Sequence, residues 1–267
     1  VSAFDLRTNF HKGNFGVMGE CAWKSQDPSF DNNYTYGNGT AVMLSGSYSK
    51  SGLSALLQVK RSENMSFRSQ RTMSGTSTFL NNMPAFSYQH TYALPALYPY
   101  ATQAAPGEWA FQGAFAYTFK RKTPLGGRYG TKVKVNLSHI RGLDRKAPTP
   151  IVGSSIAGTN GYSSSFFGMG EEYYHDFNIQ IEKKLSRSYS LSFMYMNQMV
   201  NDDVLKISES ENAGNIKTNV FVYEGKWTID RRFTFRHELQ YLTSRQDLKD
   251  WAYGLLELSV APYLMFT

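Results

Sequence analysis

The chain has a single cysteine, Cys21, which excludes an intrachain disulfide and any cysteine-rich metal site. It also has no run that approaches the roughly 18 apolar residues of a transmembrane helix. Together with a mean hydropathy of −0.42, this argues against a bundle of membrane helices. An initial Met and a charged-then-apolar leader are both missing, which indicates either a removed signal peptide or a piece of a longer protein.

Aromatic residues, by contrast, make up 15% of the chain and follow a regular pattern. From Trp109 to Lys120, every second residue is aromatic apart from Gly113, and the residues between them are small, polar or cationic. After a turn-rich connection, residues 132–138 alternate in the same way. Alternation of period two is typical of a β-strand, and about ten residues is the length that a tilted strand needs to cross a bilayer. This hairpin fits either an outer-membrane barrel or a soluble β-sandwich.

Comparable runs recur along the chain and predict about eleven strands. The last run begins at Trp251, and its facing cannot be assigned from the pattern. The other ten runs cover residues 4–10, 15–24, 42–48, 53–60, 109–120, 132–138, 177–182, 189–195, 221–228 and 233–241.

The connections between these runs alternate between short and long almost throughout. In an up-and-down sheet every second connection lies at the same end, so tight turns gather at one end and long loops at the other. Outer-membrane barrels are arranged in this way, whereas the links of a Greek-key sandwich are not sorted by end. We therefore predict an all-β fold, an antiparallel up-and-down transmembrane β-barrel, in one domain over residues 1–267. Single-chain bacterial barrels close with even strand numbers, so eleven strands indicate an incomplete barrel, unless residues 62–108 contain another strand.

The net charge of +7 and pI near 9.3 would suit a nucleic acid or an anionic surface. The basic residues are, however, scattered through strands and turns, without a basic helix or a long cluster. We interpret them as solvated charges of turns and of a barrel lumen, and predict no nucleic-acid partner. The residues predicted to line the lumen are Lys60, Gln112, Lys132, Lys134, Glu182, Glu224, Lys226, Arg236 and Glu238.

Two long connections, residues 62–108 and 142–175, are predicted to be external loops. The first contains an aromatic, proline-spaced stretch with Tyr92, Tyr98 and Tyr100. These three side chains could stack on the sugars of a glycan or plug the pore. Packing of the loop against its own barrel is the alternative interpretation of the same stretch.

Residues for catalysis or metal binding do not form a recognisable motif. A hydrolase triad needs a nucleophile, a base and an acid in contact, and no G-x-S-x-G nucleophile turn is present. His139 and His237 fall on the apolar faces of their strands, as interfacial histidines would. The group Glu171, Glu172, His175 and Asp176 is interpreted as a solvated acidic strand entry, because its spacing fits no standard calcium loop. We predict no enzyme activity, metal or cofactor.

Four phrases of the sequence resemble an uncharacterised outer-membrane β-barrel family of Bacteroides-type Gram-negative bacteria: KRSENMSFR at 60–68, HTYAL at 90–94, LYPYATQ at 97–103 and YTFKR at 117–121. The resemblance extends over most of the chain, and it implies a barrel and an outer-membrane address. It also implies that family members are longer than this sequence. It brings no catalytic residues, because the family has no assigned activity.

The sequence thus predicts a porin-like or scaffold protein of the bacterial outer membrane. A lumen with an excess of basic residues would select solutes by size and charge, with a mild preference for anions. The alternative is a barrel that binds a glycan or protein through its long loops, or a TonB-dependent receptor barrel, although no plug domain is visible. The expected partners are outer-membrane lipid, and then small solutes, glycans or other envelope proteins.

Overall fold

The structure is a computed structural model, and it describes residues 1–73, 78–148, 155–208, 214–247 and 249–267. The described residues form twelve strands, one short 3-10 helix and one short α-helix. None of these helices is long and apolar enough to span a membrane. The elements are β1 (Ala3–Lys12), β2 (Phe15–Lys24), η1 (Phe30–Asn32), β3 (Gly39–Lys50), β4 (Leu53–Glu63), β5 (Glu108–Phe119), β6 (Thr131–Lys146), β7 (Ser163–Lys184), β8 (Tyr189–Asn201), α1 (Asp202–Leu205), β9 (Asn215–Thr228), β10 (Phe233–Ser244), β11 (Trp251–Val260) and β12 (Leu264–Phe266).

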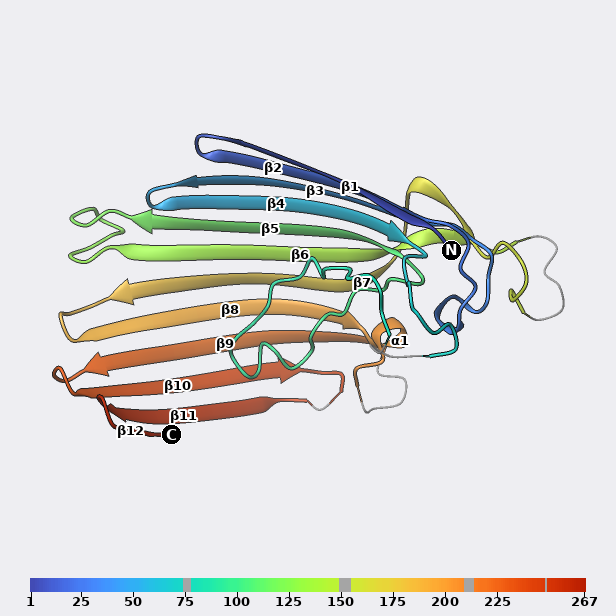
Figure 1. Cartoon of the computed structure of the whole chain (residues 1–267). Coiled ribbons are helices and arrows are strands. Elements are labelled where there is room, and N and C mark those ends of the chain that lie inside the picture. The colour runs from blue at the N-terminus through green and yellow to red at the C-terminus, as the bar shows by residue number, and fades with distance from the viewer. Residues whose placement is uncertain (74–77, 149–154, 209–213, 248) are drawn as a thin grey trace.

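The strands form one sheet in which each strand pairs with its neighbours in the chain, in the order β1 to β12. All neighbouring strands in this order pair antiparallel, so the predicted all-β, up-and-down fold is confirmed for the described residues. Eleven strands were predicted, and the additional one is the three-residue β12. Within the described residues, β1 and β12 are the free edges of the sheet, which is therefore open (Figure 1).

The connections are largely sorted by end, as predicted: tight turns lie at one end of the strands and longer loops at the other (Figure 1). The exception is the β5–β6 connection, residues 120–130, which is a longer loop at the turn end. The β1–β2 turn has only two residues, and Gly13 adopts a φ of 60° there, which a residue without Cβ reaches easily. The loop end includes residues 25–38 and 64–107.

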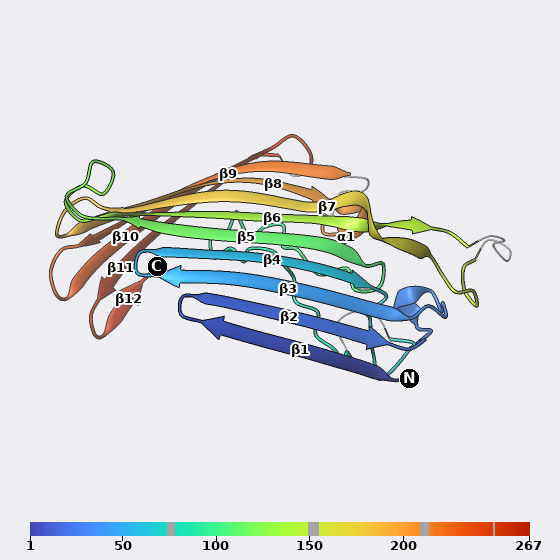
Figure 2. The ribbon, with the colours of Figure 1, turned by 90° about the horizontal axis from the view of Figure 1, so that it is seen from above.

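The β6–β7 connection is shorter than the sequence predicted, because both strands extend past the rest of the sheet. The loop was expected over residues 142–175, whereas β6 continues to Lys146 and β7 begins at Ser163. The register shifts several times between Ile140 and Arg145. These irregularities interrupt the alternation of side chains, and for this reason the pattern underestimated both strands. Figure 2 shows the extension projecting at the loop end.

The sheet is curved, with β1 and β12 bending toward the same side (Figure 2). On the concave side lie residues 84–107, which we call the inner segment, from the connection between β4 and β5 (Figure 1). The sheet face that it covers is the inner face, and the opposite one is the outer face. The expectation that this connection is an external loop is therefore not met by the inner segment, which folds back onto the sheet.

A hydrophobic core forms between the inner segment and the inner face. Phe86, Leu94 and Tyr98 of the segment pack with buried residues of β8, β9 and β10, such as Met196 and Val220. Complete burial of a Leu or Phe side chain contributes about 1.5–3 kcal/mol, so these contacts favour the inward position of the segment. The preceding residues 64–73 instead contact the 25–38 loop, for example through the Arg68–Asp31 ion pair at 2.5 Å.

Candidate functional site

The inner face is strongly polar, and it carries all nine residues that the sequence assigned to a lumen. Strand alternation and register determine this placement. Lys60 lies beside Ala110, two residues from Gln112, and Lys132 lies opposite Glu182. On the last strands, Lys226 pairs with Arg236 and Glu224 with Glu238. That these side chains line an aqueous channel stays a prediction.

A buried ion pair lies at the loop end of the inner face. The Lys60 Nζ lies 2.7 Å from a Glu108 carboxylate oxygen, and neither side chain is exposed to solvent. The same ammonium group donates to the Pro84 carbonyl at 2.6 Å and to the Thr102 hydroxyl at 3.2 Å. Buried charges are tolerated when they are paired and hydrogen bonded, and here the partners come from both ends of the inner segment.

The centre of the inner face holds the segment through further polar contacts. His90 Nε2 lies 2.5 Å from the Asp176 carboxylate of β7. The Leu94 backbone N–H donates to Gln240 at 2.8 Å, and Gln198 donates to the Tyr98 carbonyl at 3.0 Å. Because these contacts reach β7, β8 and β10, the segment bridges the hollow of the sheet and occupies the space where a lumen would lie.

The three predicted loop tyrosines point into this interior. Tyr92 donates to Glu224 at 3.1 Å, and burial together with that carboxylate raises the pKa of Tyr92 to about 12. Tyr98 is only 4% exposed and donates to Asp247 at 2.8 Å. Tyr100 donates to Glu108, and burial, followed by that carboxylate, raises the pKa of Tyr100. The structure thus places Tyr98 and Tyr100 where they cannot stack on an external glycan, and it favours the packing alternative.

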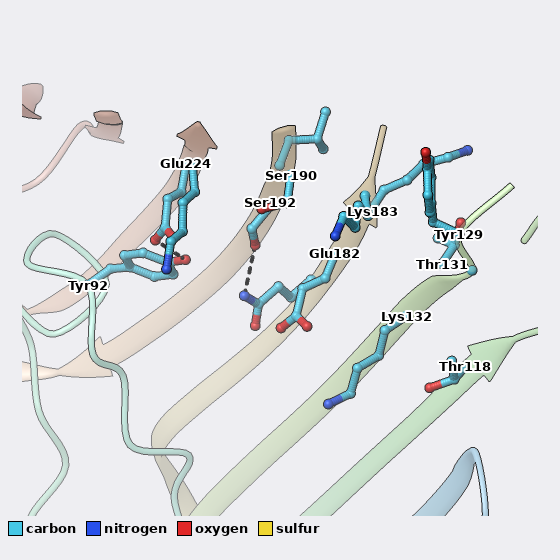
Figure 3. A pocket seen from close by; sticks show the side chains of 15 residues that line it. Tyr92, Thr118, Tyr129, Thr131, Lys132, Glu182, Lys183, Ser190, Ser192 and Glu224 are labelled. Atoms are coloured by element: carbon cyan, nitrogen blue, oxygen red, sulfur yellow. Dashed lines mark hydrogen bonds between the residues drawn. The ribbon is translucent and has the colours of Figure 1, made fainter. Parts of the chain in front are cut away.

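A polar cavity of about 450 Å³ remains at the turn end, between Tyr92 and strands β5 to β9 (Figure 3). Its carboxylates are partly neutralised, because Glu182 pairs with Lys134 and Glu224 lies 3.1 Å from Arg236. Four lysines of the lining, Lys132, Lys183, Lys184 and Lys226, make no ion pair with any described residue. The cavity therefore has a net positive lining that suits small anionic solutes.

The outer face has the opposite character. Large apolar side chains stand exposed on it, for example Leu6 at 72% and Leu57 at 71%. Following the register, aromatic residues gather toward both ends of the strands, and aliphatic residues lie between them together with a few further aromatic ones such as Phe115 and Phe193. The turn-end aromatic belt contains Phe10, Phe15, Tyr48, Tyr117, Phe119, Tyr189, Trp227 and Phe233. The loop-end belt contains Phe4, Trp23, Trp109, Phe111, Tyr195, Phe221 and Tyr241.

The chain matches, over residues 1–267, the family described as "Family of unknown function (DUF6029)". It belongs to this family. The predicted membership of an uncharacterised family is thereby confirmed, whereas a Bacteroides-type source stays a prediction. No curated protein matches the DUF6029 chain.

Among solved structures, this DUF6029 chain is similar to one titled "NanC porin structure in rhombohedral crystal form". The alignment covers 97% of this chain and 92% of that one, with 9% sequence identity and a TM-score of 0.33. So low a score carries no argument about the fold or the function. The architecture described above rests on the strand order and register of the DUF6029 chain itself.

The structure separates the acidic group that the sequence singled out near residue 175. Asp176 is on the inner face with His90, while Glu172 and His175 are on the outer face beside His139. His237 is also on the outer face, between Tyr189 and Tyr223. The pairing of His139 with Glu172 could not be read from the sequence, because the two residues are 33 positions apart and the strand pairing between them is irregular.

Proposed function

We propose that this DUF6029 chain forms the wall of a β-barrel in the bacterial outer membrane, of porin-like or scaffold type, with its outer face in lipid. The observation that carries the proposal is the exposed apolar outer face. Soluble proteins rarely expose contiguous apolar patches above a few hundred Å², and here such side chains cover strand after strand. Lipid is the environment in which this face is stable.

The dimensions of the apolar face support the proposal. Ten residues separate Trp109 and Phe119 on β5, which is about 34 Å at roughly 3.4 Å per residue. With the tilt of about 40° that is usual for barrel strands, this length spans about 26 Å along the membrane normal. That matches the apolar band of outer-membrane barrels, about 25 Å high between two aromatic girdles.

The inner face supports a restricted lumen rather than a wide pore. The inner segment fills the centre, and the cationic cavity near Lys132 and Lys226 remains at the turn end. In this proposal, solutes and not lipid meet the inner face, and small anions are preferred. Replacing residues 84–104 by a short Gly/Ser linker should therefore convert a weakly conducting protein into an open channel with mild anion preference. Planar-bilayer recordings that show strong cation preference, or no gain of conductance, would argue against a plugged pore.

A binding role is the second candidate, and one specific feature favours it. The projecting part of β7 carries Phe166 and Phe167, and Phe167 is 79% exposed. Such a ring at the loop end could contact a glycan or another envelope protein. Substitution F167S should then abolish capture of the partner while conductance stays unchanged. Tyr98 and Tyr100 are buried, so this binding role is proposed for the β6–β7 extension and not for these tyrosines of the β4–β5 connection.

The membrane assignment itself is tested by cell fractionation and gel migration. The full natural chain should be found in the outer-membrane fraction. It should also migrate faster in detergent gels before boiling than after, because a folded barrel resists detergent until it is heated. Recovery in the soluble fraction, with no change of migration on boiling, would contradict the proposal.

A further inference from the structure

Three side chains with metal-binding atoms meet on the outer face at the loop end of β6 and β7. His139 of β6 lies directly opposite His175 of β7, and Glu172 lies beside them. Their candidate ligand atoms are all within 4.8 Å of one another. We propose that His139, His175 and Glu172 form a binding site for a divalent transition-metal ion such as Zn²⁺.

An irregularity of β7 brings Glu172 into this group. Ile140 pairs with Tyr174, and the next residue, Arg141, pairs with Glu172, so Tyr173 is an extra residue in β7. In a regular strand, positions 172 and 175 would point to opposite faces. The bulge at Tyr173 turns Glu172 to the face of His175, and bulges are frequent where a strand must redirect a functional side chain.

The packing of Tyr173 against Gly142 holds the bulge in place. Tyr173 is 1% exposed, and a Cβ on Gly142 would come within 2.5 Å of its hydroxyl oxygen. Only glycine at position 142 leaves room for this ring without a shift. The redirected position of Glu172 is therefore a fixed property of the β6–β7 pair.

The donor set and its spacing suit a metal ion of intermediate softness, such as Zn²⁺. Two imidazoles and one carboxylate occur in catalytic zinc sites, which leave a further position for water, and in other transition-metal sites. Ligands around a tetrahedral zinc ion lie roughly 3.4 Å apart, given bonds of about 2.1 Å. His139 Nδ1 and a Glu172 carboxylate oxygen are already 3.3 Å apart. His175 offers a ring nitrogen within 4.8 Å of the other two donor atoms, so a shift of roughly 1 Å would bring it to the ligand spacing.

The surroundings leave the three donors available. The side chains of His139 and Glu172 are 34% and 39% exposed. His139 pairs with Phe111 of the loop-end aromatic belt, which in the proposed barrel lies at the boundary between lipid and water, so an ion can reach the donors from the loop side. The neighbouring Arg141 donates twice to the Gly170 carbonyl, at 3.0 and 2.7 Å, and is thereby held by the backbone. A bound ion would join β6 to β7 where their projecting extension begins.

The test uses purified full-length protein in detergent micelles after removal of metals with a chelator. Co²⁺ serves as the spectroscopic probe, because its visible absorption reports histidine and carboxylate ligands, and Zn²⁺ is then added as competitor. We expect one Co²⁺ per chain, displaced by Zn²⁺. Each of H139A, H175A and E172Q should weaken Co²⁺ binding at least about tenfold. A loss of this size is typical even when the mutated residue only hydrogen-bonds to a metal ligand. The double variant H139A/H175A should lose the Co²⁺ spectrum.

The matched controls are H237A and H11A, which remove the other outer-face histidine and an exposed one on β1. Both should bind Co²⁺ as the natural chain does. Heat-dependent gel migration checks folding, and H139Q replaces H139A if that variant does not fold. The proposal is wrong if stoichiometric Co²⁺ gives no spectrum, or if H237A weakens binding as much as H139A. This readout does not depend on a bilayer, so its failure is distinct from failure of the membrane proposal.

Discussion

Lys60 on β4 and Glu108 on β5 form an ion pair of 2.7 Å without solvent exposure, at the point where the chain leaves the sheet and returns to it. The pair connects the two strands that flank the inner segment, and both side chains also bond to the segment. It thus acts as a clamp between the inward-folded chain and the wall.

Removing one partner of this clamp should destabilise the protein strongly. Breaking a buried ion pair costs about 3–5 kcal/mol, because it leaves an uncompensated charge in the interior. We expect K60M and E108Q each to lower the free energy of unfolding in urea by this order. The double variant K60M/E108L should recover part of the loss, since two apolar side chains leave no unpaired charge. Equal stability of K60M and the natural chain would show that the clamp contributes nothing.

A charged residue introduced at the middle of the outer face should destabilise the protein, whereas one introduced on the inner face should not. Leu57 is 71% exposed and lies between the two aromatic belts, whereas Ser54 of the same strand is exposed on the inner face. An arginine at the bilayer midplane costs about 2–4 kcal/mol. L57R should therefore lower the free energy of unfolding in lipid vesicles by this amount, with S54R as the matched control. A smaller loss for L57R than for S54R would contradict lipid exposure of the outer face.

Alkaline pH should release the inner segment through Tyr92, whose pKa is raised to about 12 by burial and by Glu224. The pKa in the unfolded chain is about 10, so the folded state favours the protonated ring. The stability from this group is then fully present below pH 10 and lost as the pH rises toward 12. Urea unfolding at a series of pH values should show a decline in this window that is smaller in Y92F. If the free energy of unfolding declines equally with pH in Y92F and in the natural chain, ionisation of Tyr92 does not cause the decline.

The strand alternation was sufficient to predict the fold and the two faces of the sheet. It placed Gln112, Lys134 and Glu224 on one side because each belongs to a regular strand, where the period of two determines facing. The position of the inner segment could not be predicted in this way. Its contacts, such as Leu94 with Gln240, join residues 146 positions apart and leave no local periodicity.

The metal-binding group was hidden for a related reason. The bulge at Tyr173 changes the facing of Glu172, so a pattern of period two assigns this side chain to the wrong face. The strand β12 was missed because three residues are too few to show alternation. Both features become visible only once the pairing of strands is known.

The orientation of the wall in lipid is tested most directly through Cys21, the single cysteine, which is exposed on the outer face of β2. A nitroxide label on Cys21 is compared, in vesicles, with the same label on C21S/A22C, because moving the thiol by one residue changes the face. The proposal predicts that oxygen dissolved in lipid relaxes the label at position 21, and that a water-soluble nickel chelate relaxes the label at 22. Equal access of the nickel chelate to both labels, or the reverse preference, would contradict an outer face in lipid.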